Sequence, residues 1–122
     1  SAADRECSQW VQQDSAQYVM DEFGFWYTKT KKQYSDHLKE GEKVLIRIQM
    51  HEMNGDLLAD IEEYLSIGSG DWPLVINRSL KQMSRGEEMR IVAPWYTAYG
   101  AEGATLIKPY SNIIITLTTI EE

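Results

Sequence analysis

Hydrophobic and polar residues alternate most clearly in the middle of the chain, from Lys43 onward. Val44, Ile46, Ile48 and Met50 occupy every second position, and mostly polar residues stand between them. Successive side chains of a β-strand point to opposite faces of the sheet. The period of two therefore predicts a strand with one buried face.

A tight turn follows this strand. Asn54-Gly55 is the strongest short signal for a hairpin, because both residue types tolerate the positive φ angles that the turn requires. We expect the return strand to run from Leu57 to Ile67, where Gly68-Ser69-Gly70 ends it.

The N-terminal segment has a different period. Residues 5–22 contain neither glycine nor proline and place hydrophobic side chains at helical spacing, namely Cys7, Trp10, Val11, Tyr18 and Val19. This pattern predicts one helix over residues 5–22, with Gly24 as its C-terminal stop. The β-branched and aromatic residues over 25–30 then favour a strand.

The second half of the chain is expected to begin with a short helix. Asp71 would cap this helix, with Pro73 in its first turn. Its buried stripe would consist of Ile76, Leu80 and Met83. Further strands are predicted over residues 87–92 and 113–120, with mostly loop over residues 94–112.

These elements indicate the α+β class, with an antiparallel sheet, one short central helix and an N-terminal helical extension. At 122 residues, without a linker or an internal repeat, the chain fits one domain. Its hydrophobic fraction of 43% and charged fraction of 25% are typical of a folded globular protein.

Charge and composition exclude several kinds of partner. The net charge is −7, and Lys29–Lys32 holds the only local excess of positive charge, so we expect no nucleic-acid partner. No apolar run reaches the ~20 residues of a membrane-spanning helix. The polar start, Ser1–Asp4, is not a signal sequence, and we expect it to be a trimmed terminus. Cys7 is the only cysteine, which excludes an internal disulfide.

Motifs for metal or nucleophile chemistry are incomplete. His51-Glu52 resembles the start of a zinc-protease motif, but no second histidine follows at the required spacing. Gly68-Ser69-Gly70 lacks both the spacing of a nucleophile elbow and the later glycine of a dinucleotide-binding loop. We therefore expect neither a metal nor a cofactor.

Seven short motifs follow one another in order between Gly24 and Ile120: Gly24-Phe-Trp-Tyr27, Lys39-Glu-Gly-Glu-Lys-Val-Leu-Ile46, Met53-Asn-Gly-Asp-Leu-Leu-Ala59, Ile67-Gly-Ser-Gly70, Met83-Ser-Arg-Gly-Glu87, Ala98-Tyr-Gly100 and Ile107-Lys-Pro109. This ordered set resembles the FKBP-type peptidyl-prolyl cis-trans isomerases. The resemblance implies an FKBP-like domain over residues 24–122, in which the antiparallel sheet wraps around the central helix. Residues 1–23 would be the helical extension.

The resemblance also implies a site and a mechanism. Rotation about an X–Pro bond faces a barrier of roughly 18–20 kcal/mol, and the twisted amide is less polar than the planar one. An apolar pocket that excludes water therefore favours the transition state. By resemblance, Tyr99 is the catalytic residue, and its hydroxyl donates to a bound carbonyl. The substrate-binding residues would be Ile48, Leu58, Tyr64, Trp72, Pro73, Ile76, Tyr99, Ile107 and Ile115.

Several departures from the family pattern lower the expected activity. Ile76 replaces a floor tryptophan, Ile48 replaces a tyrosine, and Leu58-Ala59 replaces a Phe-Asp pair. Asp60 comes one residue late, which on a strand places it on the other face. Pro73 stands where the family uses a backbone N–H, and proline has none. We therefore expect weak isomerase activity.

Two other roles fit the same residues. A non-catalytic peptide-binding or chaperone module would retain the groove for unfolded or proline-containing polypeptides. A structural domain of an envelope lipoprotein is the third possibility. The N-terminal helix followed by Gly24–Tyr27 resembles short extracytoplasmic bacterial members of the family. The resemblance thus implies a periplasmic location or a lipid anchor in the envelope, and it leaves the oligomeric state open.

Overall fold

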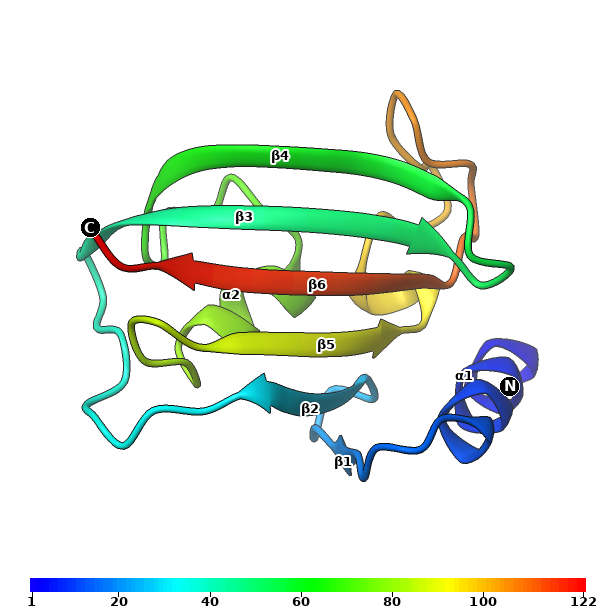
Figure 1. Ribbon diagram of the computed structural model, residues 1–122. Helices are drawn as coiled ribbons and strands as arrows, with labels where there is room; N and C mark the ends of the chain where they lie inside the picture. Colours follow the sequence, from blue (N-terminus) through cyan, green and yellow to red (C-terminus); the bar gives the residue numbers. More distant parts are fainter.

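The computed structural model describes residues 1–122, and its six strands form one antiparallel sheet (Figure 1). The strand order across the sheet is β1-β2-β5-β6-β3-β4. The elements are α1 (Ala2–Gln13), β1 (Val19–Met20), β2 (Trp26–Lys31), β3 (Lys43–Glu52), β4 (Leu57–Ser66), α2 (Leu74–Leu80), β5 (Glu88–Ala93), the short 3₁₀ helix η1 (Trp95–Thr97) and β6 (Ile113–Ile120). The predicted α+β architecture is confirmed.

The predicted central hairpin is confirmed as β3 and β4. Every second side chain of β3, from Val44 to Met50, is buried, as the alternation predicts. The turn between the strands contains Gly55 at φ 97°, a conformation that glycine adopts without steric cost. β6 pairs with the other edge of β3, so the two longest inner strands lie side by side at the centre of the sheet.

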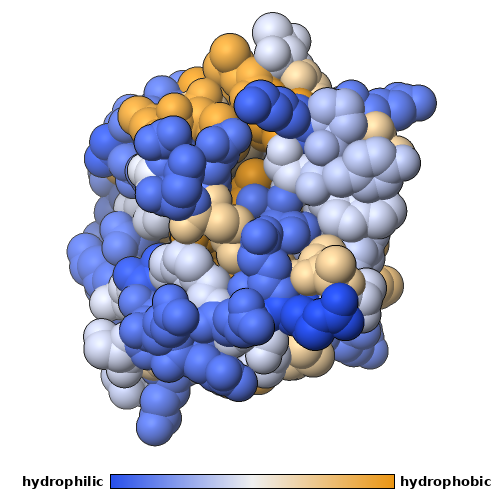
Figure 2. All heavy atoms as spheres, turned by 90° about the vertical axis from the view of Figure 1, so that its right-hand side faces the viewer, coloured by the Kyte–Doolittle hydropathy of each residue, from blue (hydrophilic) through white to orange (hydrophobic).

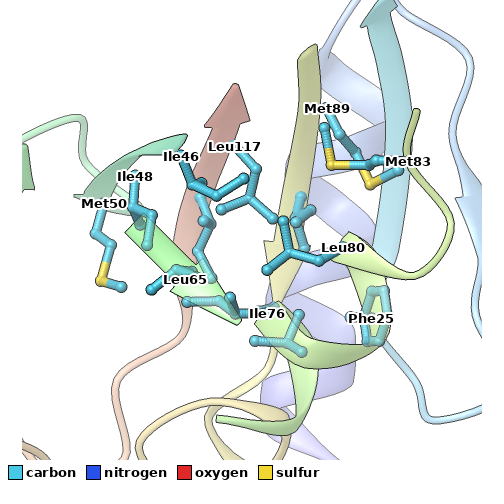
Figure 3. Close-up of a cluster of buried hydrophobic side chains, with 14 of the residues drawn as sticks. Phe25, Ile46, Ile48, Met50, Leu65, Ile76, Leu80, Met83, Met89 and Leu117 are labelled. Atoms are coloured by element: carbon cyan, nitrogen blue, oxygen red, sulfur yellow. The ribbon is translucent and has the colours of Figure 1, made fainter. Parts of the chain in front are cut away.

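The core lies between one face of the sheet and α2, as Figure 3 shows. Ile76 and Leu80 of α2 point toward Ile46 of β3 and Leu117 of β6. All four side chains are buried. Burying a side chain of this kind contributes about 1.5–3 kcal/mol, so the contact between α2 and the sheet is a main source of stability.

The start of α2 differs from the prediction. Asp71 does not cap the helix, because Pro73 is its N-cap residue and no side chain bonds to the free N–H groups there. The side chain of Asn77 instead donates to the carbonyl oxygen of Trp72 at 2.7 Å and fixes the incoming loop. The predicted buried stripe of Ile76, Leu80 and Met83 is confirmed.

The predicted helix over residues 5–22 is wrong beyond Gln13, where α1 ends. Val19 and Met20 form a short edge strand against β2. Asp14 is the C-cap residue in extended backbone, and its carboxylate accepts hydrogen bonds from Tyr18 (2.8 Å) and from Arg90 of β5 (2.7 Å). The bonds to Arg90 and to β2 stabilise an extended path that local helix propensity does not predict.

Side-chain hydrogen bonds hold the N-terminal segment on the rest of the chain. Asp4 accepts from the Tyr96 hydroxyl, and Glu6 accepts from the Asn112 amide at 2.8 Å. Cys7 lies on the buried face of α1, and burial raises the pKa of its thiol to about 12. The N-terminal segment is therefore docked on the rest of the chain. No helix of the structure combines the length and the apolar character that crossing a bilayer requires.

A second hydrogen-bonded group joins the segment after β1 to α2. The buried carboxylate of Asp21 accepts from Arg78 and from Gln82, each at 3.1 Å, and from the Phe23 backbone N–H at 2.9 Å. Burial alone would raise the pKa of Asp21, but these three donors outweigh it, and the pKa lies below its ordinary value. This network fixes the chain where it enters β2.

Candidate functional site

Four of the predicted site residues form an apolar floor. Ile48 of β3, Ile115 of β6 and Ile76 of α2 are completely buried, and Ile107 of the loop before β6 is nearly so. All four belong to one hydrophobic core cluster. The alternation within β3 and β6 turns Ile48 and Ile115 to the same face of the sheet, the face that α2 covers.

Leu58, Trp72 and Tyr99 border this floor. Each is half-buried and packs against the core cluster. They come from three separate parts of the chain, which are the edge strand β4, the loop before α2 and the loop after η1. The fold therefore brings together seven of the predicted residues: Ile48, Leu58, Trp72, Ile76, Tyr99, Ile107 and Ile115.

Backbone hydrogen bonds hold Tyr99 in place. η1 follows Pro94, and Gly100 N–H donates to the carbonyl of Trp95 at 2.9 Å, which closes the turn on one side of Tyr99. On the other side, Gly103 N–H donates to the carbonyl of Tyr99 at 3.0 Å. Tyr99 is thus presented from a bonded turn rather than from a free loop.

The hydroxyl of Tyr99 has no hydrogen-bond partner within the chain. The side-chain hydrogen bonds of the structure include those of Tyr18 and Tyr96 but none of Tyr99. Burial raises the pKa of the Tyr99 hydroxyl, so the group stays protonated at neutral pH. It is a half-desolvated donor that is free for a ligand.

Pro73 lies at the N-terminus of α2, next to Trp72. Its carbonyl accepts from the N–H groups of Ile76 and Asn77, both at 3.1 Å. Its ring nitrogen has no hydrogen to offer. The position can therefore supply an apolar contact but no hydrogen bond to a ligand.

Comparisons of the fold now identify the architecture. No protein-family model matches the sequence, and no curated protein matches it. Among solved structures, a peptidyl-prolyl cis-trans isomerase from Pseudomonas syringae pv. tomato superposes with a TM-score of 0.78 at 21% identity, over 98% of this chain and 92% of that one. FkpA from Escherichia coli gives 0.83 at 15% identity, over 98% of this chain but 57% of FkpA. AtFKBP13 gives 0.80 at 18% identity, over 88% of this chain and 99% of that one.

The chain has the FKBP-type fold. This likeness extends over α1 as well as the sheet in the first two comparisons, because each covers 98% of the chain. At these identities the likeness establishes the architecture, and the chemistry of the site has to be argued from the residues themselves.

Within the FKBP-type fold, Tyr64 lies apart from the other predicted site residues. It is opposite Leu45 in the ladder, on the outer face of the sheet, and 54% of it is exposed. The Nζ atom of Lys43 lies 5.4 Å from the centre of its ring. Tyr64 therefore does not border the apolar floor.

Ile61 borders the floor instead, although the sequence analysis did not select it. It lies directly opposite Ile48 in the ladder, on the same inner face, and 39% of it is exposed. The alternation within β4, counted back from the buried Leu65, is the signal that would have found it. The predicted displacement of Asp60 to the other face is confirmed, since Asp60 pairs there with Arg47 at 2.9 Å.

The surface around this site is apolar, but the floor is covered. Exposed hydrophobic side chains of the bordering segments include Leu57, Ile61, Leu74 and Leu106. Figure 2 shows hydrophobic atoms gathered at the top of one side of the molecule, where Figure 1 places β4 and the loop before β6.

Five of the seven surface clefts have volumes of about 270–590 Å³. Of the predicted site residues, only Tyr64 lines any of them. A hollow for a prolyl ring beside Tyr99 therefore stays a prediction. No group of three or more His, Cys, Asp or Glu side chains is placed to hold a metal.

Proposed function

We propose that this chain is a peptidyl-prolyl isomerase-like domain that binds proline-containing polypeptide on the apolar floor beside Tyr99 and isomerises it weakly. The observation that carries the proposal is the state of Tyr99. Its ring packs on the core cluster, while its hydroxyl has no partner in the chain. The FKBP-type fold around it supports the assignment.

The proposed mechanism needs no nucleophile. A prolyl ring would reach Ile48, Ile76, Ile107 and Ile115 once the side chains that cover them move aside, with Leu58 and Trp72 at its sides. There the amide would lose contact with water, and the less polar twisted state would be stabilised relative to the planar one. The Tyr99 hydroxyl would donate to a carbonyl oxygen of the substrate and hold the chain in register.

Two substitutions account for the low activity that we propose. Pro73 offers no N–H, and Ala59 offers no carboxylate, so two orienting groups of the family pattern are missing. Each missing hydrogen bond would cost about 1–3 kcal/mol of transition-state binding, which is one to two powers of ten in rate.

NMR exchange spectroscopy on short X–Pro peptides tests the proposal. We expect micromolar protein to accelerate cis-trans exchange, and Tyr99→Phe to reduce that acceleration by about tenfold through loss of one hydrogen bond. Tyr34→Phe is the matched control, because Tyr34 is 94% exposed and lies in a separate loop. An unaccelerated exchange at micromolar protein would exclude the enzymatic part of the proposal.

A non-catalytic binding module or chaperone is the second candidate. It is favoured by the same two missing groups together with the apolar lining that the chain keeps. In that case the wild type would suppress aggregation of an unfolded client, and Tyr99→Ala would suppress it less. Equal suppression by the two proteins would exclude this site as the client-binding surface.

We further propose an extracytoplasmic location, either in the periplasm or lipid-anchored to the envelope, with residues 1–23 as the extension and residues 24–122 as the FKBP-like domain. The support is the resemblance of the N-terminal segment to extracytoplasmic bacterial members of the family. A structural role in an envelope lipoprotein fits the same location. Cell fractionation, followed by mass spectrometry of the mature N-terminus, would test it.

A further inference from the structure

One edge of the sheet is open along most of β2. β1 covers only Trp26 and Tyr27 of this strand. From Thr28 to Lys31, β2 pairs with β5 on one side, with a shift of register between Lys29 and Lys31, and has no neighbouring strand on the other. An open edge of this kind is a template for a further strand.

The backbone of Lys29 faces this open side. Asp21 N–H donates to the carbonyl of Phe25 at 2.8 Å, so the backbone groups of Phe25 point toward β1. Backbone groups of an antiparallel strand point alternately to its two sides, which gives Tyr27 and Lys29 the same direction as Phe25. Val19 is opposite Tyr27 in the ladder, and no strand residue of β1 is opposite Lys29.

The open edge is held rigidly. The buried carboxylate of Glu87 binds the Lys29 ammonium group at 2.9 Å and accepts from the Gln33 N–H at 2.9 Å. The hydroxyl of Ser84 donates to the carbonyl of Ser35 at 2.7 Å. A partner strand would therefore meet an ordered backbone, and little conformational entropy would be lost on this side.

The side chains along this edge are basic and partly apolar. Lys31 and Lys32 are exposed, and no carboxylate of the chain pairs with either, although the protein carries a net charge of −7. Glu87 binds Lys29, and Glu88, which lies opposite Lys31 in the ladder, accepts from Thr30. A cleft of about 330 Å³ adjoins the edge and is lined by Gln17, Val19, Tyr27, Thr28, Lys29 and Lys32.

An exposed aromatic side chain follows the edge. Tyr34 is the most exposed of the large hydrophobic residues, and the Nζ atom of Lys32 lies 5.5 Å from the centre of its ring. Exposed tyrosines provide large contact areas in interfaces at a small entropic cost.

We propose that the open edge of β2, from Thr28 to Lys32, docks an extended acidic segment of another polypeptide as an added strand. The backbone of that segment would pair with Lys29, and its carboxylates would lie against Lys31 and Lys32. An apolar side chain would enter the cleft beside Val19 and Tyr27. This interaction is independent of the apolar floor beside Tyr99, because β2 and β4 lie at opposite sides of the sheet.

An octapeptide of alternating glutamate and valine is the probe. Titration into ¹⁵N-labelled protein should shift the amide signals of Thr28 to Gln33 most. Lys31→Glu/Lys32→Glu should weaken binding by about tenfold, because two favourable charge contacts become repulsive. Lys39→Glu/Lys108→Glu changes the net charge equally at two other exposed lysines and should bind nearly as well as wild type.

The same octapeptide with N-methylated valines should bind at least tenfold more weakly, since its valine residues can no longer donate backbone hydrogen bonds to the edge. Equal weakening by the two double variants would overturn the proposal in favour of general charge attraction. Undiminished binding of the N-methylated peptide would overturn the added strand. If the wild type does not bind the probe and Lys31→Thr/Lys32→Thr dimerises, the lysines serve only to prevent self-pairing, and the proposal is wrong.

Discussion

The ammonium group of Lys29 lies 2.9 Å from the carboxylate of Glu87, and the Glu87 side chain is completely buried. The Ser84 N–H donates to the same carboxylate oxygen at 2.7 Å, and the Gln33 N–H donates to the other at 2.9 Å. Three donors therefore satisfy a charge that would be unfavourable alone in the core. Glu87 joins β2 to the turn before β5.

Replacing this carboxylate should be costly. We expect Glu87→Ala to lower the free energy of unfolding by about 3 kcal/mol, because it leaves two backbone N–H groups and one ammonium group without their acceptor. Urea denaturation measures the change. Glu62→Ala, on the exposed face of β4, is the control and should change stability by no more than about 0.5 kcal/mol. A loss below about 1 kcal/mol for Glu87→Ala would mean that water replaces the carboxylate there.

The Glu87 carboxylate should make the free energy of unfolding depend on pH in the acidic range. Burial alone would raise the pKa of Glu87, but the N–H groups of Gln33 and Ser84 and the Lys29 ammonium outweigh it, so the pKa lies below the ordinary value of 4.5. Because the folded pKa is the lower one, the unfolded chain binds the proton first, and the stabilisation present above pH 4.5 is lost as the pH falls further.

Urea unfolding between pH 6 and pH 3 should therefore give a shallower pH slope for Glu87→Gln than for the wild type. The pKa of Asp21 is lowered in the same sense, so some slope should remain in the variant. Identical slopes for the two proteins would contradict the assignment of a lowered pKa to Glu87.

Pro73→Ile should raise isomerase activity. The substitution supplies a backbone N–H at the N-terminus of α2, next to Trp72, where a substrate carbonyl is expected. One added hydrogen bond would raise kcat/KM by about tenfold. Replacing the proline ring also gives the unfolded chain more conformational freedom. The free energy of unfolding should therefore fall by about 0.4–1 kcal/mol.

The double variant Pro73→Ile/Tyr99→Phe tests whether the new N–H acts on the same bound substrate. We expect its kcat/KM to be higher than that of Tyr99→Phe, because the new N–H is present, and lower than that of Pro73→Ile, because the hydroxyl is lost. A Pro73→Ile protein with normal folding and unchanged kcat/KM would place the substrate elsewhere.

Gly103→Ala should disturb the loop that carries Tyr99 and Ile107. Gly103 has φ +70°, and a Cβ atom there would collide with the carbonyl oxygen of Ile107 and lie 2.9 Å from the carbonyl carbon of Lys108. Gly55→Ala is the matched control, because Gly55 also has positive φ (+97°) but no atom within 4 Å of the added Cβ. We expect Gly103→Ala to cost about 2 kcal/mol more than Gly55→Ala in thermal or urea unfolding. Equal costs would show that the backbone of Ile107 shifts freely.

The strands were the most predictable part of the fold. β3 alternates cleanly, β6 is rich in β-branched residues, and the β3–β4 turn has a strong local signal, so short-range patterns were sufficient. The end of α1 was not predictable in this way. Tyr18 and Val19 fit a helical stripe as well as a strand, and the deciding partner of Asp14 and Tyr18 is Arg90, more than seventy residues away.

The candidate site was predictable in part for a related reason. Motif order placed Tyr99, Ile76 and Ile107, and the structure brings them together. Tyr64 was selected by resemblance alone, and the ladder places it opposite Leu45 on the outer face, where the alternation counted from the buried Leu65 also puts it. Whether Tyr99 acts on a substrate depends on the shape of the covered floor, which no motif encodes.

The edge strand β1 has a practical consequence for anyone who shortens this protein. A fragment that begins at Gly24 would lack the two residues that shield Trp26 and Tyr27, and Arg78 and Arg90 would lose the carboxylates of Asp21 and Asp14. A deletion that stops before Asp14 would remove only the helix and leave those guanidinium groups neutralised. Trimming for crystallisation or display should therefore begin between Gln13 and Asp14.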